Sequence, residues 1–345
     1  MRTLKIGSRV IGKEEPTMCI AEIGSNHDGD LQKGKDLMHA SKEAGADAVK
    51  FQSFTAEGLF NPYRPENGKW TPHPAYPLIE KLTLPEEWHY ELKEYADSLG
   101  IMFLSAAFDA DRAALLDRIG VPAFKVASGD LTNEPLLAQL AGYKKPMIIS
   151  TGASYLGEVE RAIEVIRGEG NNEIALLHCV SLYPPCFEDA NIRAMTTLAA
   201  AFDLPVGYSD HTPGWTVPIA AVALGGSIIE KHITFSRSLK GPDHPYALEV
   251  DEYKTMVQEI RNLEKAIGDG RKRPAHAEMG ERTGARRSIY ARSNIEEGTV
   301  ITADVLKLVR HAYGLKPGDM KMLIGKTAAR NIDAHELITW KDIQG

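Results

Sequence analysis

Short apolar runs alternate with longer stretches of helical periodicity between Met18 and about Gly268. The runs predict eight strands, at 18–23, 47–52, 101–106, 122–127, 146–150, 173–178, 205–209 and 227–232. Helical stretches lie between or after them, among them 31–44, 87–98, 109–118, 155–168, 215–224 and 252–267. Eight strand–helix units is the number in a closed barrel, and the G-x-G-x-x-G turn of a dinucleotide-binding open sheet is absent. We therefore predict an α/β fold, a (β/α)8 TIM barrel.

The pattern changes after the predicted barrel. Residues 268–287 are rich in glycine, proline and charge, which indicates a linker. Short strands and turns follow, so we expect three parts: a barrel domain at 1–267, the linker, and a small β-rich domain at 288–345. Within the barrel, the long segment 53–86 follows the second strand, and loops of that length are often functional covers.

Composition restricts the partners. The chain has 345 residues and a formal net charge of −7, which argues against nucleic acid or an anionic membrane as the main partner. An anionic substrate must then be held by local cations. The N-terminus carries no long apolar run, so we expect no signal peptide or membrane anchor. Cys19, Cys179 and Cys186 lack metal-binding spacing and are expected to be reduced thiols of a cytoplasmic protein.

Two lysines stand inside apolar strands. Lys50 lies in Ala-Val-Lys-Phe-Gln and Lys125 in Ala-Phe-Lys-Val-Ala. A lysine at such a position is either a surface side chain that reaches solvent or a buried charge that needs a partner. With the hydroxyl residues Ser128, Ser150 and Thr151 also near strand ends, the pair suits a phosphate or carboxylate.

Two histidines end neighbouring strands. His211 follows Tyr-Ser-Asp and His232 follows Glu-Lys. They are either buried hydrogen-bonded side chains or two ligands of a divalent cation with open positions for oxygens, which favours Mn2+ or Mg2+ over structural zinc. The carboxylates Glu22, Asp130 and Asp210 lie near the same strand ends, and their spacing alone does not assign their roles.

Eight ordered motifs resemble the sialic acid (N-acetylneuraminate) synthase family, which includes legionaminic and pseudaminic acid synthases. They are AEIGSNH at 21–27, VKFQ at 49–52, FKVASG at 124–129, ISTG at 149–152, HCVSLYP at 178–184, GYSDH at 207–211, EKH at 230–232 and GPDH at 241–244. The segment from Ser288 resembles that family's antifreeze-like (SAF) domain, of the β-clip type.

The resemblance implies condensation of phosphoenolpyruvate with an N-acylated amino-hexose, such as N-acetylmannosamine or a diacetamido-dideoxy analogue. The product is a nine-carbon 2-keto sugar acid, and phosphate is released. The implied phosphoenolpyruvate ligands are Lys50, Lys125, Ser128, Ser150 and Ser209. The implied metal ligands are His211 and His232, and Glu22, Asp130 and Tyr183 would hold the sugar or transfer protons.

Further substrate contacts are expected from Gln52, Ser181, Asp243 and Arg310. Arg310 stands in the C-terminal module, where the family's usual Arg-Pro-Gly is replaced by Arg-His-Ala. We expect a homodimer in which this small module completes the neighbouring subunit's site. Two alternatives stay open: a metal-dependent aldolase that acts on a phosphorylated sugar, and a carbohydrate- or ice-binding protein.

Overall fold

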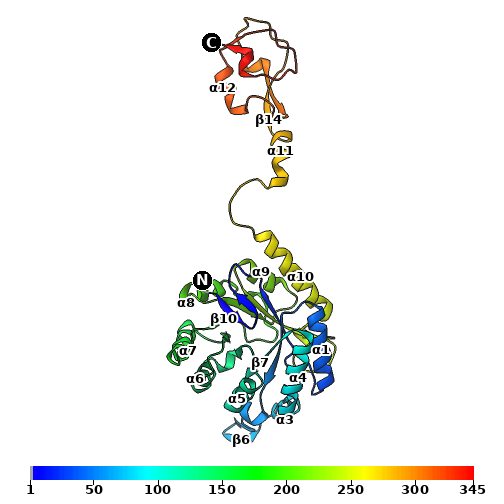
Figure 1. Cartoon of the computed structure of the whole chain (residues 1–345), viewed down its shortest axis with the longest axis vertical. Coiled ribbons are helices and arrows are strands. Elements are labelled where there is room, and N and C mark those ends of the chain that lie inside the picture. Colours follow the sequence, from blue (N-terminus) through cyan, green and yellow to red (C-terminus); the bar gives the residue numbers. More distant parts are fainter. Residues whose placement is uncertain (1–2) are drawn as a thin grey trace. The chain divides into compact units, whose positions relative to one another are not determined.

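Eight parallel strands form a closed barrel in the computed structural model, which describes residues 3–345 (Figure 1). They are β3 (Met18–Glu22), β4 (Ala48–Ser53), β7 (Met102–Ala107), β8 (Phe124–Val126), β9 (Met147–Ser150), β10 (Ile174–Cys179), β11 (Val206–Asp210) and β12 (Ile228–Thr234). The barrel closes because β12 pairs with both of its neighbours: Ile229 lies opposite Tyr208 of β11 and opposite Cys19 of β3. The predicted barrel is confirmed.

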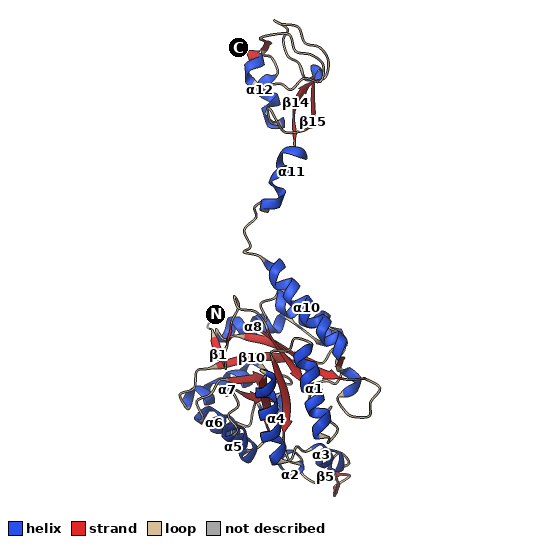
Figure 2. Ribbon diagram, turned by 45° about the vertical axis from the view of Figure 1, so that its right-hand side comes forward, coloured by secondary structure: helices blue, strands red, loops and turns tan. Residues whose placement is uncertain are grey.

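Helices surround the strands and bury their apolar faces against them (Figure 2). They are α1 (Leu31–Glu43), α4 (Glu86–Leu99), α5 (Ala110–Arg118), α6 (Glu134–Gly142), α7 (Leu156–Gly168), α8 (Arg193–Phe202), α9 (Thr216–Ala223) and α10 (Val250–Ile267). Side-chain caps set several helix starts: Asp30 accepts from the Gln32 and Lys33 amides, and Asp109 accepts from the Arg112 amide. Across residues 3–345, no helix has the length and apolar character needed to cross a bilayer.

An N-terminal hairpin closes one end of the barrel and was not predicted. Its strands β1 (Leu4–Ile6) and β2 (Arg9–Ile11) pair antiparallel. Leu4, Ile6 and Ile11 join a buried cluster with residues at the beginnings of the barrel strands, including Met18 and Ile228. The amino-terminal end of the barrel is therefore plugged, and the opposite end carries the polar side chains.

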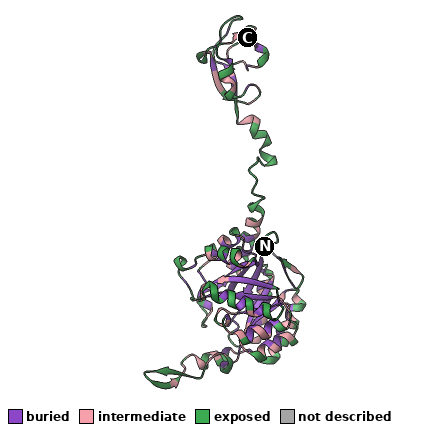
Figure 3. Ribbon diagram, turned by 90° about the vertical axis from the view of Figure 1, so that its left-hand side faces the viewer, coloured by how far each residue is buried: buried purple, intermediate pink, exposed green. Residues whose placement is uncertain are grey.

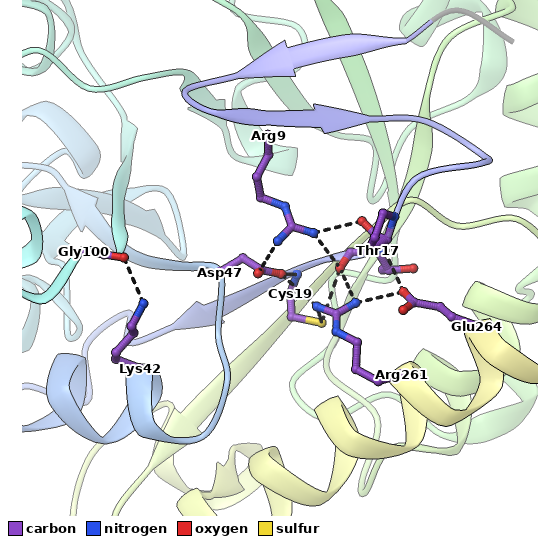
Figure 4. Close-up of polar contacts among 9 residues, drawn as sticks. Arg9, Thr17, Cys19, Lys42, Asp47, Gly100, Arg261 and Glu264 are labelled. Atoms are coloured by element: carbon purple, nitrogen blue, oxygen red, sulfur yellow. Dashed lines mark hydrogen bonds and ion pairs between the residues drawn. The ribbon is translucent and has the colours of Figure 1, made fainter.

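A polar network reinforces the plugged end (Figure 4). Asp47, just before β4, accepts from the Cys19 amide at 2.8 Å and from Arg261 of α10 at 3.1 Å, and it also pairs with Arg9 of the hairpin. Arg261 donates in addition to the Thr17 carbonyl at 2.9 Å. One carboxylate thus connects the hairpin, the first two barrel strands and the last helix of the barrel.

The segment 53–86 is more ordered than a plain loop. It contains α2 (Ala56–Leu59), the antiparallel strands β5 (Tyr63–Glu66) and β6 (Lys69–Pro72), and α3 (Tyr76–Leu82). The hairpin of β5 and β6 is largely exposed, with Trp70 at 66% of its full accessibility (Figure 3).

Residues 269–345 form a second compact unit, whereas the first ends at Gly268. The second unit contains η4 (His276–Glu278), α11 (Met279–Gly284), β14 (Arg287–Ala291) paired with β15 (Leu306–Arg310), α12 (Met320–Leu323), and β16 (Thr327–Ala328) paired with β17 (Ile343–Gln344). It has its own apolar core, which includes Ile289, Leu306 and Ile338. The predicted small β-rich C-terminal fold is confirmed, and η4 and α11 lie within the stretch predicted as linker.

The plug predicts a stability difference between two positions of one hairpin. Ile6 is fully buried and Val10 is 40% exposed. Ile6→Ala should lower the free energy of unfolding by about 2–5 kcal/mol, because it leaves a cavity at the barrel end. Val10→Ala should change it by about 0.5 kcal/mol or less. Urea unfolding of both variants checks this; equal effects would show that the hairpin does not plug the core.

Candidate active site

A cavity of about 290 Å³ opens at the carboxyl ends of the barrel strands. It is lined by polar and charged residues from seven of the eight strands or the loops that follow them, as expected for the catalytic face of this fold. Eleven of the predicted site residues line it: Glu22, Lys50, Gln52, Lys125, Ser128, Ser150, Tyr183, Ser209, His211, His232 and Asp243.

The two lysines are buried and face carboxylates. Lys50 Nζ lies 2.7 Å from Glu22 Oε2, and Glu230 Oε1 lies 3.7 Å from both Lys50 Nζ and Lys125 Nζ. Lys125 also donates to Ser150 Oγ at 2.7 Å. These side chains are at most 6% exposed, so the alternative of lysines reaching solvent is wrong.

The same surroundings shift the pKa values of the two ammonium groups in opposite directions. Burial alone lowers the pKa of Lys50, but the adjacent Glu22 and Glu230 outweigh it, and the pKa lies above its ordinary value. Burial lowers the pKa of Lys125 more than Glu230 raises it, and the nearby Lys50 lowers it further. Lys125 is therefore the ammonium group that is held less firmly in its charged form.

Glu230 was not among the predicted site residues. Its Oε1 accepts from Ser209 Oγ at 3.1 Å, and its Oε2 is buried without a hydrogen-bond partner. Burial raises its pKa, but Lys125 and Lys50 together hold it below the ordinary value. The signal was present in the sequence, because Glu230 and His232 are two residues apart on one strand and must face the same side.

Two imidazoles lie side by side beneath two tyrosine rings. The ring centroids of His211 and His232 are 5.2 Å apart, with Tyr183 4.5 Å from His211 and Tyr246 5.0 Å from His232. Burial, followed by the proximity of His232, lowers the pKa of His211 to about 3. His211 is therefore neutral at physiological pH, which is the form of histidine that binds a metal.

These residues fit a divalent ion whose remaining ligands are oxygens. His232 Nδ1 is buried at the cavity wall without a hydrogen-bond partner, and it lies 3.9 Å from Asp243 Oδ2. Within residues 3–345, no cluster of three or more His, Cys, Asp or Glu side chains has the arrangement of a metal site. A pair of imidazoles alone leaves positions open, as in sites of Mn2+ or Mg2+ type rather than closed zinc sites.

Asp243 is held next to the imidazoles by a short loop. It accepts from the Ser25 amide at 2.9 Å, from Ser25 Oγ at 2.7 Å and from Tyr246 Oη at 2.7 Å. Gly24 has a φ of +53°, and a Cβ there would lie 2.7 Å from Asp243 Oδ2. Glycine is required at this position because the backbone conformation and the carboxylate both exclude a side chain.

Gly152 leaves room for two serine hydroxyls that lie close to its Cα. Ser128 Oγ accepts from the Gly152 amide at 3.0 Å, and a Cβ on Gly152 would lie 2.7 Å from Ser128 Oγ and 2.4 Å from Ser181 Oγ. Ser181 Oγ is buried without a partner. Ser181 lines a neighbouring groove rather than the cavity.

Two further predicted residues do not line the cavity. Asp130 lies in η1 (Ser128–Asp130), near Asn133, and burial raises the pKa of its carboxyl group. Arg310 is exposed at the end of β15 in the second unit.

Conversely, Cys179, Pro242 and Tyr246 line the cavity and were not predicted to do so. Cys19 and Cys179 are buried free thiols, whereas Cys186 is exposed.

The closed barrel and its convergent cationic, carboxylate and imidazole groups define a barrel enzyme with its site at the strand carboxyl ends. The NeuB family model matches residues 37–272, and the SAF domain model matches residues 286–344. The chain belongs to the NeuB family and carries a C-terminal SAF domain, as the resemblance indicated.

Relatives along the whole chain agree with this assignment. The N,N'-diacetyllegionaminic acid synthase of Legionella pneumophila is 41% identical, over 98% of each chain. The human N-acetylneuraminate-9-phosphate synthase is 34% identical, over 96% of this chain and 93% of its own. A crystal structure of the sialic acid synthetase of Leptospira borgpetersenii in complex with citrate has a TM-score of 0.75 and 34% identity, over 81% of this chain and 95% of its own. The prediction of an enzyme of the sugar acid synthase class is confirmed.

The buried charges predict a non-additive mutational effect. Lys50→Met should lower the free energy of unfolding by about 3–5 kcal/mol, because it leaves the Glu22 carboxylate buried without its cation. Adding Glu22→Gln should recover most of the loss, since no unpaired charge then remains at that position. Urea unfolding of the single and double variants measures this coupling, and additive losses would rule out a direct pair.

Proposed function

We propose that this enzyme condenses phosphoenolpyruvate with an N-acylated amino-hexose to give a nine-carbon 2-keto sugar acid of the sialic acid type, with release of phosphate. The acceptor would be N-acetylmannosamine or a diacetamido-dideoxy analogue. The observation that carries the proposal is one cavity in which Lys50, Lys125, His211 and His232 converge. The names of the relatives, which are synthases of three kinds of sugar acid, support it.

The phosphate and carboxylate of phosphoenolpyruvate would bind to Lys50 and Lys125, assisted by the hydroxyls of Ser128, Ser150 and Ser209. Charge-assisted hydrogen bonds of this kind are the strong ones. The lining residues contain two ammonium groups but three carboxylates, those of Glu22, Glu230 and Asp243. The site alone is therefore not cationic, and a multiply charged anion needs a further cation.

The neighbouring imidazoles of His211 and His232 would hold that cation, Mn2+ or Mg2+. When bound, a divalent ion supplies Lewis acidity toward the aldehyde oxygen of the acceptor sugar. The buried, unpartnered Nδ1 of His232 and the neutral His211 are the features of this chain that suit such a role. Asp243, Gln52 and Ser181 would orient the bound substrates.

The reaction forms a bond from the enol C3 to the aldehyde carbon. Water then adds to C2, and phosphate leaves by C–O cleavage, so that phosphoenolpyruvate, sugar and water give keto acid and phosphate. The ammonium groups of Lys50 and Lys125 stabilise the negative charge of the departing phosphate. Glu22, Asp130 and Tyr183 would hold the sugar hydroxyls or transfer protons, with the carboxylates accepting from water and the phenol donating to oxygen.

One observation favours an aldolase of the kind that works through a lysine imine rather than through a metal. Lys125 is buried, and its pKa is lowered, which is the environment of a lysine that forms imines with carbonyl substrates. The 2.7 Å hydrogen bond to Ser150 instead suits a lysine that binds an anion. Borohydride added in the presence of substrates separates the two readings, since only an imine is trapped covalently on Lys125.

The test of the proposed activity is an acceptor panel with phosphoenolpyruvate. Phosphate release should require both phosphoenolpyruvate and an amino-hexose, and mass spectrometry should find the condensed keto acid. The panel contains N-acetylmannosamine, its 6-phosphate and a diacetamido-dideoxy hexose. No phosphate release with any of them would defeat the proposal. Lys125→Met should lower kcat/KM by about 10²–10³-fold, whereas Val10→Ala at the plugged end of the barrel serves as the unchanged control.

We further propose that the enzyme is a cytoplasmic homodimer in which Arg310 of the C-terminal unit completes the neighbouring subunit's site. The exposed position of Arg310 in a separately folded unit supports this. Small-molecule substrates remain the only partners that we expect besides the second copy, with no role for nucleic acid or membrane.

Complementation tests this arrangement. Arg310→Ala and Lys125→Met homodimers should each be strongly impaired. A refolded equimolar mixture should regain about a quarter of wild-type activity, because half of the dimers are mixed and each mixed dimer has one intact site of two. Recovery would be absent if Arg310 served its own subunit's site, and gel filtration of each variant confirms that the dimer persists.

A further inference from the structure

A buried ion pair lies directly behind the two imidazoles, on the outer side of the barrel wall. Lys231 Nζ and Asp210 Oδ2 are 2.5 Å apart, and both side chains are fully buried. Neither residue lines the cavity or belongs to the proposed chemistry. Burying two charges costs free energy unless their mutual attraction and further hydrogen bonds offset the loss of hydration. A fully buried pair at this place therefore needs an explanation.

Strand register explains where the pair lies. Asp210 of β11 and Lys231 of β12 are direct partners in the parallel pairing of the two strands. The next residues along the chain are His211 and His232. Since successive side chains on a strand point to opposite faces, the pair points outward and both imidazoles point into the cavity.

The pair also fixes the backbone on both sides of His211. Asp210 Oδ1 accepts from the Thr212 amide at 3.1 Å and from Thr212 Oγ1 at 2.9 Å, and Lys231 Nζ donates to the Thr212 carbonyl. Residues 210 and 212 are thereby both tied to one ammonium group. That ammonium belongs to the residue immediately before His232.

We infer that Asp210 and Lys231 are positioning residues that set the separation of His211 and His232 by locking the ends of β11 and β12 together. The inference rests on the metal role proposed above for the two imidazoles. Removing a residue that supports a metal ligand from outside commonly weakens metal binding by about 10–100-fold. This pair would act in the same way, but through the backbone rather than through the imidazole rings.

The test compares Asp210→Asn/Lys231→Met with Asp47→Asn/Arg261→Met. Each double variant removes both members of an ion pair. In the control, Arg9 and Glu264 also lose a partner, but both side chains are partly exposed, so neither variant leaves a fully buried unpaired charge. The second pair lies at the plugged end of the barrel (Figure 4) and is the matched control. Circular dichroism establishes that each variant is folded, and electron paramagnetic resonance of free Mn2+ measures metal affinity.

The expected result is a rise of about 10–100-fold in the Mn2+ dissociation constant for Asp210→Asn/Lys231→Met and no change for the control. A dissociation constant within about two-fold of wild type for both would overturn the inference. If the double variant does not fold, Thr212→Val, which removes only the hydroxyl that donates to Asp210, should still weaken Mn2+ binding; unchanged affinity there would also overturn it.

A metal-free measurement separates this inference from the proposed function. In crystals of the metal-free proteins, the centroids of His211 and His232 should stay 5.2 Å apart in the wild type and the control. They should shift by about 1 Å in Asp210→Asn/Lys231→Met. An unchanged separation refutes the positioning role. Mn2+ binding that survives His211→Ala/His232→Ala would refute the metal role instead.

Discussion

The alternation of side chains along parallel strands is the constraint on which this site depends. On β11 and β12 it directs Ser209, His211, Glu230 and His232 into the cavity and sends the residues between them into the wall. A one-residue slip would exchange these two sets completely. The outer residues include the buried ion pair of Asp210 and Lys231, which we infer helps to hold the register of the inner ones.

Charge compensation is the second requirement. Lys50 and Lys125 can be buried at the mouth because Glu22 and Glu230 lie within 3.7 Å of them. The same carboxylates leave the cavity without net positive charge, so under the proposed function an anionic substrate would need the divalent cation in order to bind. In that case an acidic protein would hold an anionic ligand through a bound cation rather than through its overall field.

Whether an element was predicted correctly depended on how clearly its burial shows in the local sequence. All eight barrel strands were located to within two residues at either end, because a strand buried on both faces is a continuous apolar run. The hairpin at Leu4–Ile11 was missed, since three-residue strands carry little periodicity and its role as a plug is set by contacts with strands far along the chain. Arg310 stays a prediction, as do the roles assigned to individual side chains.

The sequence by itself determined the eight strands, the lysines and histidines that they carry and the family, because local hydrophobic pattern and ordered motifs are written in the chain. Whether the lysines are buried was left open and was decided by the structure. Only the tertiary structure decided which charges meet. Glu230 lies between two lysines, and Asp210 lies opposite Lys231, through pairings of residues 21 to 180 positions apart. Closure of the barrel creates these contacts, and no local pattern specifies a distance across a ring of strands.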